Sequence, residues 1–495
     1  MEPLVLTSRS RSEALYAQLY RALRAAILRG ELGPGARLPS TRALAADEGL
    51  ARNTVLRAYD QLLGEGYVVG RRGSATRVAA EIPDDVAEIA RVAERPQRIR
   101  RPAVPRLSRW AARLPEEWPS WAVPERGLPY DFRYGRPPFG DFPHATWARL
   151  LARRARAATI RDVDYGEPAG LPALRAAIAE YLARARAVDC QPEQVVVVHG
   201  AQQGLDLIAR VLLDPGDRVL IEEPHYSGAR RILQAAGVRL HPVPVDREGF
   251  DVARAGRVAA RARLAYVTPS HQFPTGVVMT LPRRLALLAW AERAGAWVVE
   301  DDYDSEYRYG GRPVESLQGL DRAGRVIYVG TFSKVMFPAL RLGYLVLPPR
   351  LVGPCTTAKA LADTGSPGLE QRALADFLTA GHYERYLRRT RARNRDRRAA
   401  LLAAVKHHLG DRVEVAGANA GLHVLLWLRG IPATGAPRVV TRAARVGVGV
   451  YTPDLFYLGR PPRAGLVLGY ASLDEDAIRE GIRRLARVVG GRRSL

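Results

Sequence analysis

Only three of the 75 basic residues in this 495-residue chain are lysines, and one of them, Lys334, closes the sequence Gly330-Thr331-Phe332-Ser333-Lys334. Arginine supplies positive charge equally well, but its guanidinium group keeps its proton and cannot form an imine. A lysine retained among so many arginines is therefore a candidate nucleophile toward a carbonyl compound. Chance is the alternative, because three lysines must fall somewhere, so the surrounding residues have to decide.

Three other segments carry side chains suited to binding a ligand. His199 to Gly204 is a small-residue turn that either presents free amides to a phosphate or is only a structural turn. Tyr226 offers a ring that either covers a heteroaromatic ligand or packs in a loop. Glu300 to Glu306 is an acidic run, which also suits a cation site or a solvated turn. Arg341 stands seven residues after the lysine and offers a fork-shaped donor to a phosphate.

Each of these segments follows a short β-branched run, and helical stretches separate the runs. This alternation predicts an α/β domain with a mostly parallel sheet and flanking helices. Ligands of such sheets bind at the carboxyl ends of the strands, so we expect the segments to lie together. The predicted strands are Val195–Val198, Arg218–Glu222, Val238–Val243, Leu264–Thr268, Trp297–Glu300 and Val326–Gly330.

The combination TPSHQFPTG, EDDYDSEYRY, GTFSK and LRLGY resembles the fold type I aminotransferases, and specifically the MocR/GabR-type regulators within the GntR family. The likeness covers nearly the whole chain and includes a smaller C-terminal α+β subdomain. It implies pyridoxal 5'-phosphate as the cofactor, Lys334 as its covalent anchor and no metal. It also implies that Asp301 holds the pyridine nitrogen, Tyr303 the phenolic oxygen and Tyr226 the ring face. The residues implied for the phosphate are Arg341, Ser333, Thr331, Ala201 and Gln202.

Two positions depart from the aminotransferase pattern. Phe273 stands where these enzymes usually have asparagine before Pro-Thr-Gly, and the contact of His271 and Gln272 with the cofactor edge is left open. Val467 stands about where an arginine for the substrate carboxylate is expected, and Arg463 is a nearby candidate. Turnover of amino acids is therefore less expected than sensing of the cofactor.

Residues 12–79 predict a compact unit that precedes this domain. An amphipathic helix over Leu15–Leu28 leads to a helix that starts near Thr41 behind the cap Ser40, and Gly49 ends it. A second helix follows from Arg52 to about Leu63, and a two-stranded wing runs through Gly70 to Gly73.

This unit resembles the winged helix-turn-helix of GntR regulators, although Ala51 replaces the usual serine. Polar donors in the first turns of a recognition helix reach base edges, whereas arginines outside it suit phosphates and the minor groove. A small dimerisation module with a basic face is the alternative. The residues expected to contact DNA are Arg37, Arg42, Arg52, Asn53, Thr54, Arg57, Arg71 and Arg72.

The sequence therefore predicts three regions: a DNA-binding domain at 1–79, an Arg/Pro-rich linker at 80–128 and an aminotransferase-like domain at 129–495. The excess charge of +24 is spread along the chain, so whole-chain basicity by itself says little about a DNA site. We expect a cytoplasmic protein, because two cysteines are too few for a disulfide framework and the first thirty residues contain no apolar signal-peptide core.

We expect a transcriptional regulator that binds operator DNA and responds to pyridoxal phosphate or an amine adduct of it. The resemblance also implies a domain-swapped homodimer. The rival interpretation is an active aminotransferase that carries an accessory winged-helix domain. Sustained turnover of amino acids would separate the two interpretations. Any transaminase activity is expected to be weak, because Val467 stands where the carboxylate-binding arginine is expected.

Overall fold

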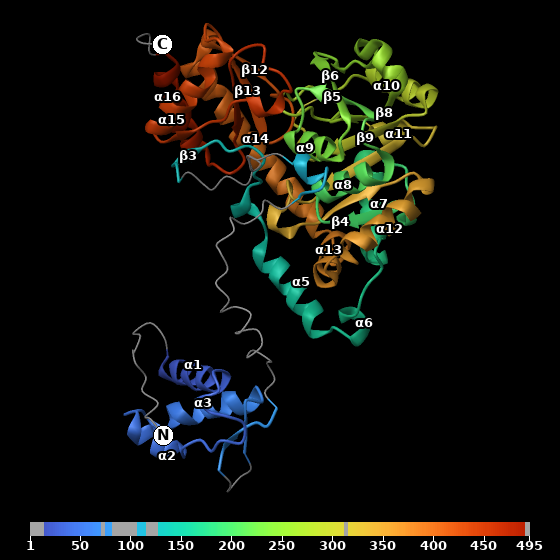
Figure 1. The fold of residues 1–495 in the computed structure, drawn as a ribbon. Helices are drawn as coiled ribbons and strands as arrows, with labels where there is room; N and C mark the ends of the chain where they lie inside the picture. The colour runs from blue at the N-terminus through green and yellow to red at the C-terminus, as the bar shows by residue number, and fades with distance from the viewer. Residues whose placement is uncertain (1–13, 71–74, 82–105, 115–126, 311–314, 491–495) are drawn as a thin grey trace. The chain divides into compact units, whose positions relative to one another are not determined.

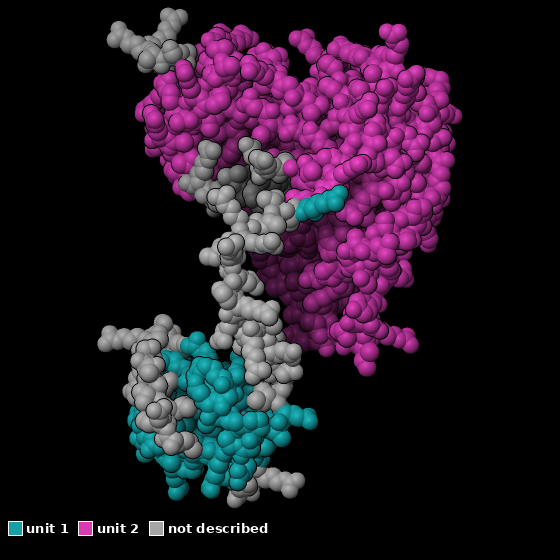
Figure 2. Space-filling view, in the orientation of Figure 1, with its two compact units in different colours: residues 1–106 teal, residues 107–495 magenta. Residues whose placement is uncertain are grey.

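The computed structural model describes residues 14–70, 75–81, 106–114, 127–310 and 315–490. The chain forms two compact units, residues 1–106 and residues 107–495, which Figure 2 colours separately. The predicted linker lies largely outside the described residues, so its bounds stay a prediction, as do Arg71 and Arg72 in the wing turn.

Within its described residues, the first unit has the helices α1, α2 and α3 and a two-stranded antiparallel wing (Figure 1). The Ser40 hydroxyl accepts a hydrogen bond from the Ala43 amide at 3.1 Å and so caps α2, while Gly49 takes the positive φ that ends it. Leu19, Leu23 and Val55 are buried in the common core. The elements are α1 (Leu15–Leu28), α2 (Thr41–Asp47), α3 (Arg52–Gly64), β1 (Val68–Val69) and β2 (Arg77–Val78).

The second unit is built on an eight-stranded sheet in the order β4-β11-β10-β9-β8-β5-β6-β7. The five central strands from β10 to β6 are parallel, whereas β11 and β7 pair antiparallel with their neighbours. The strands are β4 (Val195–Val198), β5 (Arg218–Glu223), β6 (Arg239–Asp246), β7 (Gly249–Phe250), β8 (Ala262–Val267), β9 (Trp297–Asp302), β10 (Val326–Thr331) and β11 (Gly343–Val346).

Helices cover both faces of this sheet (Figure 1). In β4, Val195 and Val197 belong to one apolar core and Val196 and Val198 to another, as expected when side chains alternate between two covered faces. The helices of the part of the chain that contains this sheet are α5 (His144–Arg156), α6 (Ile160–Val163), α7 (Pro172–Arg186), α8 (Ala201–Leu212), α9 (Ser227–Ala236), α10 (Leu281–Ala294), α11 (Leu317–Leu320), α12 (Pro349–Asp363) and α13 (Gly368–Thr379).

A smaller subdomain completes the second unit. Its antiparallel sheet has the order β12-β13-β15, and α14 and α16 pack together beside it. The predicted fold class is thereby confirmed. The elements are β12 (Val413–Ala416), β13 (His423–Leu428), β15 (Gly465–Gly469), α14 (His382–His408), α15 (Ala436–Arg445) and α16 (Glu475–Gly490), with the short parallel pair β3 (Tyr130–Asp131) and β14 (Val448–Gly449).

Candidate cofactor site and DNA-binding unit

Lys334 lies just beyond the carboxyl end of β10 and points its amine at the backbone. Its Nζ donates a hydrogen bond to the carbonyl oxygen of Gly135 at 3.0 Å. Burial lowers the pKa of this amine, and the nearby charges of Asp304 and Asp301 oppose that effect. A lysine with a lowered pKa has more free amine near neutral pH, which is the form that attacks a carbonyl carbon.

Asp301, in β9, presents one satisfied and one unsatisfied carboxylate oxygen. Its Oδ2 accepts a hydrogen bond from the Tyr266 hydroxyl at 2.6 Å, while Oδ1 is buried with no hydrogen-bond partner among the described residues. Burial raises the pKa of Asp301 to about 6, and the bond from Tyr266 counteracts part of this rise. A buried orphan oxygen is costly, so this geometry suits a ligand that brings a cationic N–H.

Donors for an anion converge where β4 leads into α8. Gly200 has a φ of 78°, and a Cβ added to it would lie 3.0 Å from Nη2 of Arg341, so only glycine leaves this space open. Arg341 donates through the same Nη2 to the carbonyl oxygen of His199 at 2.6 Å. The hydroxyl of Ser333 is buried without a partner among the described residues, and Thr331 accepts from the Ser333 amide at 3.2 Å.

The amides of Ala201 and Gln202 open α8, whose amino end favours an anion. The side chain of Gln202 also donates to the Tyr226 hydroxyl at 3.1 Å. Burial raises the pKa of Tyr226 to about 12, so its hydroxyl stays protonated. The structure thus brings the predicted phosphate residues and Tyr226 to one edge of the sheet.

Tyr303 belongs to a buried chain of polar groups beside Asp301. Its hydroxyl lies 3.0 Å from Nδ1 of His271, and that nitrogen also lies 3.0 Å from the Asp304 carboxylate. His423, whose ring packs on that of His271, has its pKa lowered to about 3 by burial and is neutral. His271 therefore joins Asp304 to Tyr303, the residue predicted to hold the phenolic oxygen of the cofactor.

The acidic run does not point its carboxylates at one shared point. Asp302 pairs with Arg186 at 2.9 Å, Asp301 faces Tyr266, and Asp304 faces His271. One group of possible ligand atoms, from His271, Asp304 and His423, does fall within 4.8 Å. Because Asp304 is already engaged by His271, the arrangement is accounted for by hydrogen bonds.

The opposite side of the site is apolar. Phe273 lies edge-on to Tyr226 and Tyr303, with ring centroids 6.2 Å and 6.0 Å apart, and Val467 is fully buried in the same cluster. Arg463 instead holds Glu414 through two hydrogen bonds at 2.6 Å and 3.2 Å. Its predicted role toward an effector carboxylate would require this pair to open.

Sequence reasoning missed three participants. Tyr266 fixes Asp301 from within a strand, and Gly135 comes from a distant segment with no motif. Glu222 was named only as the last residue of a predicted strand, yet burial raises its pKa to about 7 and its Oε1 has no partner among the described residues. A charged residue inside an apolar strand was the available signal for Glu222.

In the first unit, the described side chains predicted to contact DNA come from the segment before α2 (Arg37), from α2 (Arg42) and from α3. Arg37, Arg42, Arg52 and Asn53 are exposed, Arg57 is exposed near the ring of Tyr16, and Thr54 is half-buried. The N-cap position of α3, Ala51, makes no side-chain hydrogen bond. The segment before α2 and the helices α2 and α3 therefore present exposed donors to the outside.

Known proteins share both units. The family model for bacterial regulatory proteins of the gntR family matches residues 15–78, and that for aminotransferase class I and II matches residues 135–485. The chain is 42% identical to the probable rhizopine catabolism regulatory protein MocR of Rhizobium meliloti, over 97% of this chain and 95% of that protein. It is 34% identical to the pyridoxine biosynthesis transcriptional regulator PdxR of Corynebacterium glutamicum, over 93% of each.

Among solved structures, the α-aminoadipate aminotransferase LysN of Thermus thermophilus, complexed with N-(5'-phosphopyridoxyl)-L-leucine, matches with a TM-score of 0.70 and 32% identity. The match covers 78% of this chain and 97% of LysN. The fold and the two family matches define a DNA-binding regulator with an aminotransferase-like domain. The chain belongs to the MocR-type transcriptional regulators of the GntR family. None of the helices in the described ranges has the length and apolar character needed to span a membrane.

Proposed function

We propose that this regulator senses pyridoxal phosphate through Lys334 and that the bound vitamer changes its affinity for operator DNA. The observation that carries the proposal is the meeting of three features at one sheet edge: a lysine of lowered pKa, a buried unpartnered carboxylate oxygen and an open phosphate cradle. The lysine suits an aldehyde, the carboxylate oxygen suits a cationic N–H, and the cradle suits a phosphate. One molecule, pyridoxal phosphate, carries all three groups.

The residues present fit that molecule. Lys334 would hold its aldehyde carbon covalently, and Oδ1 of Asp301 would accept its pyridine N–H. Tyr303, held near His271, would face the phenolic oxygen, and Tyr226 would cover the ring. When bound, the vitamer supplies an electron-withdrawing ring next to the lysine. The phosphate would meet Arg341, Ser333, Thr331 and the amides of Ala201 and Gln202.

The apolar wall favours the vitamer itself as the effector over an amino acid. An amino acid brings a carboxylate that needs a paired cation when it is buried. Phe273 and Val467 occupy the positions where the aminotransferase pattern has an asparagine and an arginine, and Arg463 is engaged elsewhere. Active transamination remains the second candidate because the lysine and Asp301 are in place.

DNA binding belongs to the first unit. We infer that α3 enters the major groove with Arg52, Asn53, Thr54 and Arg57, while Arg37 and Arg42 contact phosphates and the wing residues Arg71 and Arg72 the minor groove. A protein with this role works where the DNA is, so we place it in the cytoplasm.

We further infer a homodimer, domain-swapped as the family resemblance implies. Ile160, Val163 and Tyr165 lie close together in the chain and are 85%, 76% and 87% exposed, which is unusual for apolar side chains of this size. A second copy of the chain that covers them would give a two-fold symmetric regulator, suited to paired half-sites.

The test begins with genome-wide mapping of bound sites, which supplies an operator. The binding of this operator to the full chain is then measured by fluorescence anisotropy, with and without pyridoxal phosphate, at one salt concentration. The proposal predicts that the vitamer shifts the dissociation constant of the wild-type protein and does not shift that of Lys334→Ala. An equal shift in both proteins contradicts it, and sustained multiple turnover with amino acids and an oxo-acid favours the enzyme.

A further inference from the structure

A second hollow lies between the large and small subdomains of the second unit, apart from the cofactor cradle. It has a volume of about 490 Å³, which is within the range of roughly 300–1,000 Å³ typical of sites for small organic molecules. Its walls are Arg247 in the β6–β7 turn, the loop 275–278 after β8, Arg308 and Gly310 after β9, and the segment 416–419 at the end of β12.

The polar lining of this hollow is cationic. No carboxylate in the described ranges lies within ion-pair distance of Arg247 or Arg308. Glu414, whose pKa is lowered first by its bond to Arg463 and in smaller part by the charge of Arg247, is already held by Arg463 in two hydrogen bonds. Two arginines without acidic partners at one hollow favour an anion.

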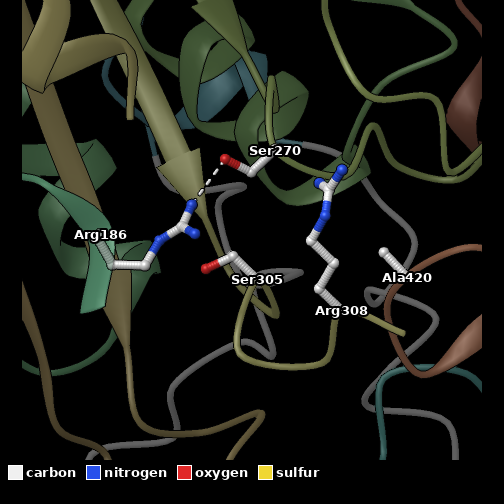
Figure 3. A pocket seen from close by; sticks show the side chains of 5 residues that line it. All are labelled: Arg186, Ser270, Ser305, Arg308 and Ala420. Atoms are coloured by element: carbon white, nitrogen blue, oxygen red, sulfur yellow. Dashed lines mark hydrogen bonds between the residues drawn. The ribbon is translucent and has the colours of Figure 1, made fainter. Parts of the chain in front are cut away.

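Arg308 is positioned to use its outer nitrogens. Its Nε donates to the carbonyl oxygen of Gly310 at 3.0 Å, which fixes the guanidinium and leaves Nη1 and Nη2 without a partner among the described residues. Figure 3 shows Arg186 bonded to Ser270, whereas no bond joins the side chain of Arg308 to the other side chains drawn. Arg186 also pairs with Asp302. Burial and the neighbouring Arg186 lower the pKa of Arg308, so an anion there would relieve an unfavourable charge.

The rest of the lining is apolar or carries a neutral donor. Val277, Val278 and the alanines of the 416–419 segment provide apolar surface, while Asn419 provides an amide. The Thr275 hydroxyl already donates to Oε1 of Gln272 at 2.6 Å. An inorganic ion would leave most of this surface uncovered. An organic acid would place its charged group between the guanidinium groups and its body on the valines.

We propose that this hollow binds a small organic acid, with a carboxylate or phosphate monoester held by Arg247 and Arg308. Bound there, the acid bridges the two subdomains. The wall adjoins the cofactor site, because Gly276 lies against Gly417, and a Cβ on Gly276 would lie 3.0 Å from Nε2 of His271.

Calorimetry on the full chain tests this with three probes of similar body: phenyl phosphate, benzoate and neutral benzyl alcohol. We expect at least one acid to bind with one equivalent per chain and benzyl alcohol not to bind. Arg247→Gln and Arg308→Gln should each weaken binding by tenfold or more. Arg210→Gln, which removes the same charge from the exposed pair with Asp206 on α8, should leave binding unchanged. Which acid binds better distinguishes the two charged groups.

Two further variants separate this site from the cofactor site. Binding should persist in Arg341→Gln, which damages the phosphate cradle, and in Lys334→Ala, so the inference stands or fails independently of the proposed sensing of pyridoxal phosphate. Loss of binding in Arg341→Gln would place the acid in the cradle and overturn the proposal. The proposal would also be overturned if neither acid binds saturably, or if Arg247→Gln binds the acid as well as the wild type does. Arg247 is exposed, so its substitution should not disturb folding.

Discussion

At the scale of one residue, Glu222 is a buried carboxyl group whose ionisation is unfavourable in the folded protein. Its Oε2 accepts from Thr268 at 2.6 Å and from Gln272 at 3.2 Å, but burial outweighs these bonds and raises the pKa to about 7. In the unfolded chain the same carboxyl has a pKa near its ordinary value of 4.5. The folded state therefore holds a proton that the unfolded state releases between these two values.

The sign of the pH dependence follows from this difference. Stability contributed by the bound proton is complete below pH 4.5 and is lost as the pH rises through about 7. Each unit of pKa shift is worth about 1.4 kcal/mol of folding free energy. Without cofactor, the unfolding free energy of the wild-type chain should therefore fall by about 3 kcal/mol more between pH 4.5 and pH 8 than that of Glu222→Gln. Urea unfolding followed by tryptophan fluorescence measures it, because residues 1–106 contain no tryptophan.

The exposed Glu193→Gln serves as the control and should follow the wild-type profile. Parallel pH profiles for wild type and Glu222→Gln would mean that Glu222 is ionised in the folded protein.

The candidate site residues were predictable to the extent that they sit next to each other in the sequence. Lys334 follows β10, and Asp301 is the penultimate residue of β9, so their place at the sheet edge follows from the order of the strands. The Gly135 contact and the Tyr266 bond depend on tertiary packing that no local pattern encodes. Arg463 was predicted from its distance along the chain, and its actual neighbour Glu414 comes from another strand.

At the scale of elements, the helix-turn-helix depends on how its two short helices begin. Ser40 caps α2, whereas Ala51 opens α3 with the same extended backbone and no side-chain acceptor. Ser40→Ala should destabilise α2 by about 1 kcal/mol, and Ala51→Ser should stabilise α3 by a similar amount. Hydrogen exchange of the full chain, read by mass spectrometry on peptides from 41–64, measures both. Unchanged exchange in the two variants would show that the caps do not limit opening of these helices.

The same element carries sequence recognition. Arg52→Ala should reduce affinity for the operator by tenfold or more and leave the affinity for random DNA less affected, because base contacts specify and phosphate contacts do not. Anisotropy on both DNAs measures the ratio, and the absorbance of bound cofactor should not change. Arg29→Ala, which removes an exposed charge paired with Glu31 in the same unit, is the matched control. Equal losses in the two variants would refute α3 as the reading helix.

The strands β4, β5, β6, β8, β9 and β10 were predicted from their short apolar runs, and α1, α2, α3 and the wing from periodicity, a cap and turn residues. The individual helices of the second unit, the strands of the smaller subdomain, β3, β14, β11 and β7 were not predicted. β11 is a short strand flanked by a left-handed Arg341, and β7 has only two residues. The chain between β10 and β11 is too short for a crossover helix, which is why this pair is antiparallel.

At the scale of the whole molecule, the proposed regulator needs two copies of the chain. Val163→Asp should place a charge in the contact and shift the mass measured by light scattering from twice 54.4 kDa toward 54.4 kDa. Leu285→Asp, at an exposed apolar position on α10, should stay dimeric. A wild-type protein that is already monomeric, or a dimeric Val163→Asp variant, would contradict the assigned surface.

The central claim is that Lys334 captures pyridoxal phosphate, and reductive trapping tests it most directly. The full chain is mixed with the vitamer, reduced with borohydride, digested and analysed by mass spectrometry. Lys359, paired with Asp363, and Lys406 are internal controls in the same molecule. We predict one phosphopyridoxyl group per chain, on the peptide that contains Lys334. An unlabelled Lys334, or label spread equally over the three lysines, would contradict the account.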